Sequence, residues 1–403
     1  MKKVQAYMVY RIGFPYFLLT LHAMLERILL APYYLTLKIR HALYDSGVFK
    51  VHTCEAPTIC VGNIAAGGTG KTPHTEMILR TLLASEKWGD KHIAVLSRGH
   101  KRKSSGFQQI MVDASASFAG DEPLQIKRKF PKVTVAVDRT RVEGCDLLLH
   151  PDKIRTSRKY RKCVHKDVQT PELIVLDDAF QYRSLQAAFN IVLVDYNRPP
   201  SKDCLLPFGR LRDLPERLFH ANVIIVTKCP KFMENWEKIE WVKSLQISDF
   251  DLETCQGTDK TGKKMTVLFT TVSYCPLEPV FEDYDRRYIY SHNLILVSGI
   301  ASDTPLRRYL SDNYEMVKHF KFNDHHKYTG MDIRRLLLAT KKWPTALVAT
   351  TEKDSQRLRD YKKMPEALRK RLFHTPIEVS FVTEHEKEVF ETTLLNALGE
   401  HKA

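Results

Sequence analysis

The chain has 403 residues, 43% of them hydrophobic, which is enough to bury two α/β cores and excludes a small disulfide-stapled scaffold. Its 62 Lys and Arg against 47 Asp and Glu give a formal net charge of +15, so we expect an anionic partner such as a nucleic acid, a phosphorylated metabolite or an acidic membrane. The eight cysteines form no CxxC pair, which favours a reducing, cytosol-facing compartment.

The first segment, residues 1–50, is rich in apolar and aromatic side chains. Its longest uncharged run, Ile12–Leu25, has about 14 residues and is shorter than the roughly 20 that a membrane-spanning helix needs. Arg27 and Lys38 would lie on one face of a helix. This pattern predicts a helix lying on a membrane surface, with a helix packed on the protein's own core as the alternative. No small-residue cleavage site follows the apolar run, which disfavours a secretory signal peptide.

From residue 51 onward, short β-branched runs alternate with helical patterns, which predicts an α/β fold with a parallel sheet. We place a first domain at residues 51–264 and a smaller α/β domain with a linker at 265–403, after a polar, lysine-rich stretch. The expected strands are Thr58–Val61, Ile93–Leu96, Val133–Val137, Leu173–Leu176, Ile191–Val194, Val223–Val226, Met265–Val272 and Leu294–Val297, and a helix is expected near His385–Leu398.

A glycine-rich segment follows the first of these strands and precedes a helical pattern that starts near Thr72. Glycines let successive N–H groups curl around an anion, and the helix start adds its positive dipole end. Lys71 can reach the outer phosphates of a nucleotide, and the Thr72 hydroxyl suits Mg²⁺. The segment therefore predicts a P-loop whose nucleotide-binding residues are Gly67, Gly68, Thr69, Gly70, Lys71 and Thr72.

The flanking residues narrow the class of P-loop protein. Ala65 stands where the strict motif has glycine, and Ala66 stands where partition-type ATPases carry a lysine. The segment Thr227–Pro230 has the lysine but not the aspartate of a guanine-reading NKxD motif. Adenine is therefore the expected base.

Three acidic positions accompany this loop. The strand-like run Leu173–Leu176 ends in Asp177 and Asp178, the form of a Walker B segment that holds Mg²⁺, with turn or helix-capping aspartates as the alternative. Asp121 precedes a helical pattern and by local chemistry alone reads as an N-cap. Far downstream, residues 322–328 gather an acid, two imidazoles and a phenol, and an acid–imidazole pair can take a proton from a hydroxyl.

Taken together, these motifs resemble the tetraacyldisaccharide 4'-kinase family, the lipid A 4'-kinases of Gram-negative-type bacteria. The blocks that carry the resemblance appear in the family's order across most of the chain, at residues 43–47, 61–73, 97–100, 120–123, 138–139, 177–181, 206–212, 298–301, 322–326 and 351–354. Two departures are Ala179 and Tyr182, where the family usually has glycine and histidine.

The resemblance implies a P-loop NTPase-type domain, a second smaller α/β domain and an N-terminal membrane-associated helix. It implies ATP- and Mg²⁺-dependent phosphorylation of the 4'-hydroxyl of a tetraacyldisaccharide 1-phosphate to give lipid IVA. In that reading Lys71 and Thr72 bind phosphate and metal, Asp177 and Asp178 serve the metal, and Asp121 pairs with His325, preferred over His326, to activate the hydroxyl. Residues implied to contact the lipid are Arg98, Lys101, Asp138 and Arg139, with a merely solvated basic turn as the alternative for Lys101.

The implied partners are the acylated disaccharide and an anionic membrane surface, at the cytoplasmic face of the bacterial inner membrane, with peripheral or monotopic attachment. The main alternative function is a P-loop ATPase switch or metallochaperone, which would hydrolyse ATP without lipid. We find no nucleic-acid-binding motif, and the basic residues are spread along the chain, so no specific nucleic acid partner is expected.

Overall fold

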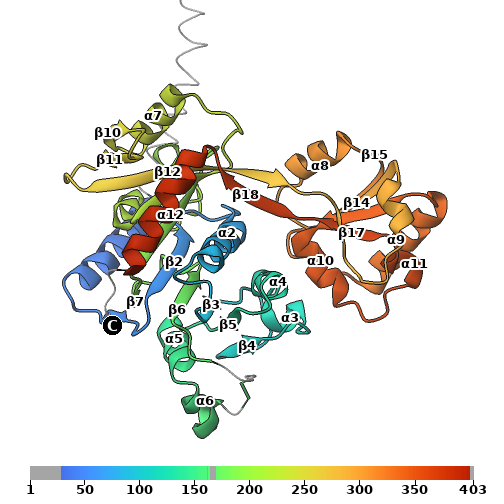
Figure 1. Ribbon diagram of the computed structural model, residues 1–403, viewed down its shortest axis with the longest axis horizontal. Helices are drawn as coiled ribbons and strands as arrows, with labels where there is room; N and C mark the ends of the chain where they lie inside the picture. Colours follow the sequence, from blue (N-terminus) through green and yellow to red (C-terminus); the bar gives the residue numbers. More distant parts are fainter. Residues whose placement is uncertain (1–28, 161, 164–168, 400–403) are drawn as a thin grey trace, which may run out of the picture.

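The computed structural model describes residues 29–160, 162–163 and 169–399, which form an α/β protein built around two sheets (Figure 1). Among these residues the larger sheet has eleven strands. In spatial order they are β10 (Ser248–Asp251), β11 (Gln256–Thr258), β12 (Lys264–Tyr274), β9 (Val223–Thr227), β8 (Phe189–Asp195), β2 (Thr58–Asn63), β6 (Leu173–Asp177), β3 (Ile93–Ser97), β5 (Thr134–Val137) and β4 (Gln108–Ile110), with β18 (Ile377–Phe381) paired to β12.

The centre of the larger sheet, from β9 to β5, is parallel, and its strands are buried on both faces. Alternate residues of β2 enter different cores: Ile59 and Val61 pack on one face and Cys60 on the other. This explains why the sequence shows continuous β-branched runs rather than alternating polar residues. The expected α/β fold and parallel strands are confirmed, with each strand one to three residues longer or shorter than expected.

Helices cover both faces of this sheet (Figure 1). One face packs against α2 (Lys71–Ala84), α3 (Ala116–Ala119), α4 (Asp121–Lys129) and α12 (Glu384–Gly399). The other packs against helix 29–45, α5 (Arg141–Leu149), α6 (Asp152–Thr156) and α7 (Asn235–Ser244). A two-stranded pair, β1 (His52–Thr53) and β7 (Leu185–Gln186), lies outside the two sheets.

The smaller sheet has five strands within the described part of the chain. Its order is β13 (Glu278–Pro279), β17 (Leu372–Thr375), β16 (Leu347–Thr351), β14 (Asn293–Ser298) and β15 (Glu315–Lys321), and all but β13 are parallel. Its helices are α8 (Thr304–Ser311), α9 (Gly330–Lys342), α10 (Glu352–Arg359) and α11 (Glu366–Arg369). These elements have cores of their own.

Two strands connect the sheets. β12 and β18 pair with each other in antiparallel fashion and extend from the larger sheet toward the smaller one (Figure 1). After β18 the chain returns to the larger sheet, where Phe390, Leu394 and Leu398 of α12 enter its core. The domain boundary placed between residues 264 and 265 stays a prediction, and the last 23 described residues, 377–399, pack with the first unit.

The expected N-terminal helical region is described only from residue 29 onward, and residues 1–28 lie outside the described part. Helix 29–45 rests on the larger core through Leu37, and His41 Nε2 lies 2.6 Å from Asp213 Oδ1. Its outward side carries exposed Leu29, Leu35 and Ile39. Among the described residues, no helix combines the length and hydropathy that crossing a bilayer requires.

Candidate active site

The glycine-rich loop joins the carboxyl end of β2 to the start of α2. Gly70 is the N-cap of α2 with a φ of 81°, and Gly67 has a φ of 114°, both in the left-handed region that glycine adopts without strain. Asn63 Nδ2 donates to Thr69 Oγ1 at 2.8 Å and fixes the middle of the loop. The first turn of α2 therefore presents its free N–H groups and positive dipole end to the loop, an arrangement that binds phosphate.

The six residues expected to bind nucleotide thus occupy one loop and the helix start after it. Lys71 is the first residue of α2, and its Nζ lies 3.6 Å from Asp178 Oδ1 at the end of the neighbouring strand β6. Asp178 therefore holds the ammonium group of Lys71 at the opening of the loop.

Asp177 and Asp178 follow the buried strand β6, as expected. Ser97 Oγ donates to Asp177 Oδ2 at 3.1 Å, whereas Asp177 Oδ1 is buried and has no hydrogen-bond partner. Burial, and then the charge of Asp178, raise the pKa of Asp177 to about 6. A buried carboxylate oxygen without a partner is a position that a hard cation or its water can complete.

Whether Mg²⁺ fits this site depends on the donor atoms that the residues offer. Asp177, Asp178 and the Thr72 hydroxyl offer the carboxylate and hydroxyl donors that Mg²⁺ prefers, and such a site keeps several waters. No group of three or more His, Cys, Asp and Glu side chains in the described part of the chain could hold a metal by itself. The donor set therefore fits a cation that shares its ligands with phosphate, and it does not resemble a closed zinc site.

Arg210 and Arg212 lie next to the loop, and the sequence motifs assign no role to either of them. Arg212 Nη2 donates to Asn63 Oδ1 at 2.6 Å and lies 3.4 Å from Asp178 Oδ1. A side chain at Gly67 would meet Arg210 Nη1 at 3.4 Å, so this guanidinium borders the loop. Both belong to the block 206–212. Two arginines so close together after the strand β8 are the sequence feature that could have predicted them.

Asp121 begins α4, but it does not cap that helix. The N-cap is Gly120, and the Asp121 carboxylate instead accepts a hydrogen bond from His325 Nδ1 at 3.0 Å. Burial alone would raise the pKa of Asp121, but hydrogen bonds from His325 and Arg357 outweigh it and lower the pKa to about 2. The local expectation of a capping aspartate is therefore wrong, because this carboxylate pairs with residues from the smaller sheet.

The two adjacent histidines have different partners. His325 contacts Asp121, has a φ of 62°, and its backbone N–H donates to the Gly299 carbonyl at 3.2 Å. His326 Nε2 lies 3.0 Å from Asp332, which takes part in the capping box of α9. The geometry therefore places His325, and not His326, next to the acid that the resemblance paired with it.

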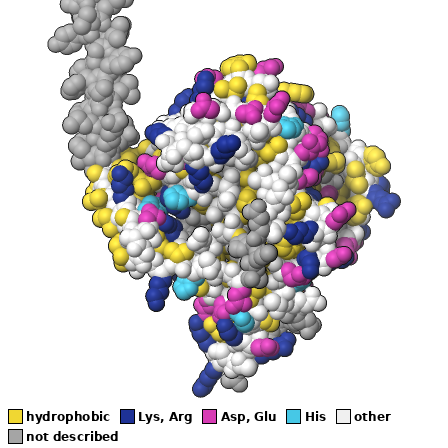
Figure 2. All heavy atoms as spheres, turned by 60° about the vertical axis from the view of Figure 1, so that its left-hand side comes forward, with side chains coloured by type: hydrophobic (Ala, Val, Ile, Leu, Met, Phe, Trp, Pro, Cys, Tyr) yellow, Lys and Arg dark blue, Asp and Glu magenta, His cyan; other side chains and the backbone are white. Residues whose placement is uncertain are grey.

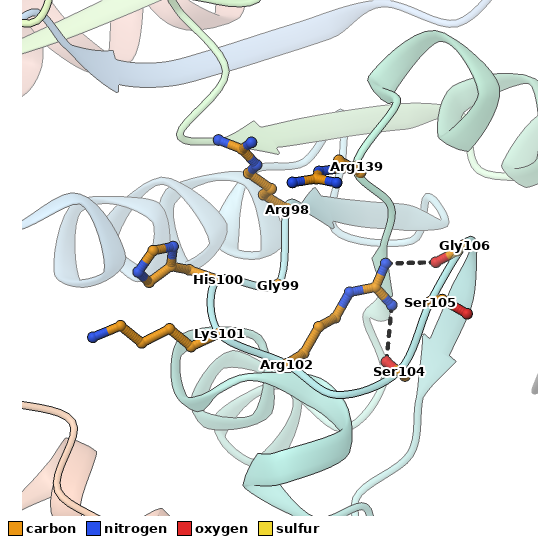
Figure 3. A pocket seen from close by; sticks show the side chains of 9 residues that line it. All are labelled: Arg98, Gly99, His100, Lys101, Arg102, Ser104, Ser105, Gly106 and Arg139. Atoms are coloured by element: carbon orange, nitrogen blue, oxygen red, sulfur yellow. Dashed lines mark hydrogen bonds between the residues drawn. The ribbon is translucent and has the colours of Figure 1, made fainter.

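A basic cavity of about 560 Å³ lies beside this pair. It is lined by Arg98, Gly99, His100, Lys101, Arg102, Ser104, Ser105, Gly106 and Arg139. Figure 3 shows His100 and Lys101 projecting to one side of the loop and Arg102 to the other, where it donates to Ser104 and to the Gly106 carbonyl. The His100 and His325 ring centroids are 5.7 Å apart, so the cavity adjoins the acid–imidazole pair.

Of the four residues expected to contact the lipid, Arg98, Lys101 and Arg139 line the cavity and Asp138 does not. Asp138 is buried, and its Oδ1 accepts a hydrogen bond from the Thr140 N–H at 3.0 Å. Burial raises the pKa of Asp138. A substrate contact through Asp138 stays a prediction that the geometry of the cavity does not support.

The glycine-rich loop follows β2, the acid pair ends β6, and the residues that line the cavity follow β3 and β5. All of them therefore lie at the carboxyl ends of the parallel strands, and the Asp121–His325 pair adjoins the cavity. Gly120 packs against Gly99, so the start of α4 touches the loop that lines the cavity. The charge of Glu122, the residue after Asp121, contributes to the raised pKa of Asp177. The start of α4 therefore lies next to the loop that lines the cavity and within electrostatic reach of the acid pair.

Comparisons with known proteins show which family and fold the chain shares. The chain is 36% identical over 362 residues to the tetraacyldisaccharide 4'-kinase of Phocaeicola vulgatus, covering 88% of this chain and 90% of the relative. It is 36% identical over 386 residues to that of Parabacteroides distasonis, covering 93% and 95%. The fold matches a crystal structure of LpxK from Aquifex aeolicus in complex with ATP, with a TM-score of 0.64, 23% identity and coverage of 92% of this chain and 99% of that one. A family model described as tetraacyldisaccharide-1-P 4'-kinase matches residues 22–399. The chain therefore belongs to the tetraacyldisaccharide-1-P 4'-kinase family.

Proposed function

We propose that this protein transfers the γ-phosphate of ATP to the 4'-hydroxyl of a tetraacyldisaccharide 1-phosphate and so produces lipid IVA in lipid A biosynthesis. The relatives' names support the reaction. One observation carries the proposal. An ionised Asp121, paired with His325, adjoins a basic cavity, and this cavity and the glycine-rich loop both lie at the carboxyl ends of the parallel strands.

The P-loop at residues 67–72 binds the nucleotide. Its N–H groups and Lys71 neutralise the β- and γ-phosphates, and Arg210 and Arg212 add positive charge beside them. Thr72, Asp177 and Asp178 would hold Mg²⁺, which when bound neutralises charge on the transferring phosphate. Asp178 also holds Lys71 at the mouth of the loop.

Asp121, His325 and the basic cavity bind and activate the acceptor lipid. Asp121 accepts from Nδ1–H of His325, which leaves Nε2 as the atom able to take the proton of the sugar hydroxyl. Arg98, Lys101 and Arg139 provide positive charge for the 1-phosphate of the disaccharide.

The lipid substrate requires access to a membrane, and we propose peripheral attachment at the cytoplasmic face of the inner membrane. Helix 29–45 supports this, because it exposes leucine and isoleucine beside Lys38. Figure 2 shows basic and acidic side chains interspersed over one face, with hydrophobic side chains gathered along its margin. An anionic lipid surface suits this combination better than a specific nucleic acid, which would need a basic stripe.

The test is transfer of label from γ-labelled ATP to the lipid disaccharide. We expect transfer by the wild type and loss of at least 100-fold in Lys71→Ala and Asp121→Ala, with both variants folded. Phosphate release that is the same with and without the lipid acceptor would instead support the ATPase-switch alternative, which the family match disfavours.

A further inference from the structure

The Asp121–His325 pair has a third member that no motif assigned, Arg357 on α10. Its Nε lies 3.0 Å from both carboxylate oxygens of Asp121, and its Nη2 donates to Asp121 Oδ2 at 2.6 Å. The same Nη2 lies 3.2 Å from His325 Nδ1. With a side chain only 9% exposed, Arg357 meets the pair inside the junction between α4 and α10.

Arg357 is itself held by a buried acid. Its Nη1 donates to Asp354 Oδ1 at 2.9 Å, and Asp354 is fully buried. Asp354 Oδ2 accepts hydrogen bonds from Thr351 Oγ1 at 2.7 Å and from the Gly299 N–H at 2.8 Å. A planar guanidinium with five donors can satisfy two carboxylates at once, which a lysine ammonium cannot do with the same geometry.

These contacts decide which nitrogen of His325 carries a proton. Asp121 is ionised and can only accept, so Nδ1 of His325 is the donor to it. Nη2 of Arg357 can only donate, and it gives one of its two hydrogens to Asp121 Oδ2, so it leaves the Nδ1–H bond from His325 to Asp121 in place. The neutral ring therefore has its lone pair on Nε2, the nitrogen that can receive a proton.

Arg357 is one of four groups that face the His325 ring. The others are Asp121 from α4, Asp324 on the same loop as His325 at 3.8 Å from Nε2, and His100 from the loop after β3. Nearby Lys353 and Glu122 form an ion pair with each other. Arg357 contacts both Asp121 and His325, so it is placed to fix their relative orientation.

We propose that Arg357 is a positioning residue for the phosphate transfer: it orients Asp121 so that His325 presents Nε2 to the acceptor hydroxyl. The proposal rests on the proposed function. In the step it serves, the O–H bond of the 4'-hydroxyl breaks and its proton goes to Nε2. The hydroxyl oxygen bonds to the γ-phosphorus, the bond from that phosphorus to the bridging oxygen breaks, and ADP leaves.

The test is a comparison of kcat and KM for lipid phosphorylation in the wild type, Arg357→Gln and Arg357→Lys. In Arg357→Gln kcat should fall at least 10-fold, because Asp121 is no longer held in the orientation that presents Nε2 of His325. The KM for ATP should stay within about 2-fold of the wild-type value, because Arg357 contacts none of the P-loop residues. Arg357→Lys should recover only part of the lost kcat, because it retains the charge and loses the bidentate contact with Asp121.

The matched control is Arg359→Gln, which removes a second half-buried arginine from α10 that makes no contact with the Asp121–His325 pair. Its kcat and KM should match those of the wild type. An unchanged kcat in Arg357→Gln, or a loss of activity that lies in the KM for ATP, overturns the proposal. If Arg357→Gln does not fold, Arg357→Lys decides: an unchanged kcat is then the contradicting result.

A second measurement does not depend on turnover. Nitrogen NMR of the labelled imidazoles should show the Nδ1–H form of His325 in the wild type, and a mixture of the two neutral tautomers in Arg357→Gln. An unaltered Nδ1–H spectrum in that variant overturns the proposal. If the wild type transfers no phosphate to the lipid, the proposed function fails, and this spectrum still tests the role of Arg357 on its own.

Discussion

Gly62 lets two parts of the active site approach each other. It lies in β2, next to Asn63 and shortly before the glycine-rich loop, and a Cβ atom there would be 2.4 Å from Phe180 Cβ and 3.0 Å from its backbone nitrogen. Phe180 follows the acid pair by two residues. The absence of a side chain at Gly62 therefore sets how closely the segment after β6 packs against β2.

We expect Gly62→Ala to lower the free energy of unfolding by about 2 kcal/mol, because backbone as well as side-chain atoms must move to admit the methyl group. The measurement is denaturant unfolding. Gly68→Ala is the control, since a Cβ there would meet nothing within 4 Å. Equal stability of the two variants would contradict the close approach.

A second residue-scale prediction concerns Asp177. Asp177→Asn keeps an oxygen that can accept from Ser97 and removes the negative charge beside the unpartnered buried position. We expect kcat to fall at least 100-fold at saturating ATP, because the site loses charge for a cation. Initial rates over a Mg²⁺ titration measure this. Wild-type rates at every Mg²⁺ concentration would remove Asp177 from the metal site.

At the scale of elements, α2, α4 and α10 meet around a half-buried cation, Lys129. Lys129 Nζ of α4 lies 2.8 Å from Glu76 of α2 and 2.5 Å from Glu352 of α10. Burial, and then the charge of Glu76, raise the pKa of Glu352 to about 7. One lysine thus holds two buried acids together at the junction between the sheets.

Lys129→Met should destabilise the fold by about 3 kcal/mol at pH 8, because it leaves two carboxylates buried without a counter-ion. The loss should be smaller at pH 6. Glu352 has a folded pKa above its unfolded value, so its contribution to stability is present at low pH and is lost as pH rises through about 7. Chemical unfolding at both pH values checks this, and a loss that grows on acidification would contradict it.

Helix 29–45 is the element on which we place membrane attachment. Leu35→Glu should weaken binding to anionic vesicles at least 5-fold in a sedimentation assay, because it puts a charge on the apolar side. Leu338→Glu on α9 is the control, since both leucines are 57% exposed. Equal loss of binding in the two variants, or none, would count against helix 29–45 as the contact.

At the scale of the whole molecule, the net charge of +15 predicts that membrane binding has an ionic part. We expect binding to vesicles containing anionic lipid to fall severalfold between 0.05 and 0.5 M salt, because the screening length shortens to a few ångströms. Binding to neutral vesicles should change little. The same salt dependence on both kinds of vesicle would contradict an electrostatic contribution.

Much of the fold could be predicted from the sequence because its signals are local. β-branched runs, glycine positions and the acids that end β6 lie within a few residues of one another, so the strand–loop–helix unit at 58–84 and the acid pair need no tertiary information. The resemblance then supplied the pairing of Asp121 with His325. Local capping chemistry alone had given Asp121 the wrong role.

The tertiary structure decided what depends on contacts distant in sequence. Asp121 and His325 are 204 positions apart and Asp121 and Arg357 are 236 apart, so only packing of α4 against α10 and against the loop after β15 brings them together. The same holds for Arg212 beside Asp178 and for the return of α12 to the larger sheet. The sequence by itself determined the glycine-rich loop between β2 and α2 and the α/β rhythm, because short-range patterning encodes them. Which charged groups surround His325 was decided by the folded chain, because the burial of long-range ion pairs leaves no periodic signal in the sequence.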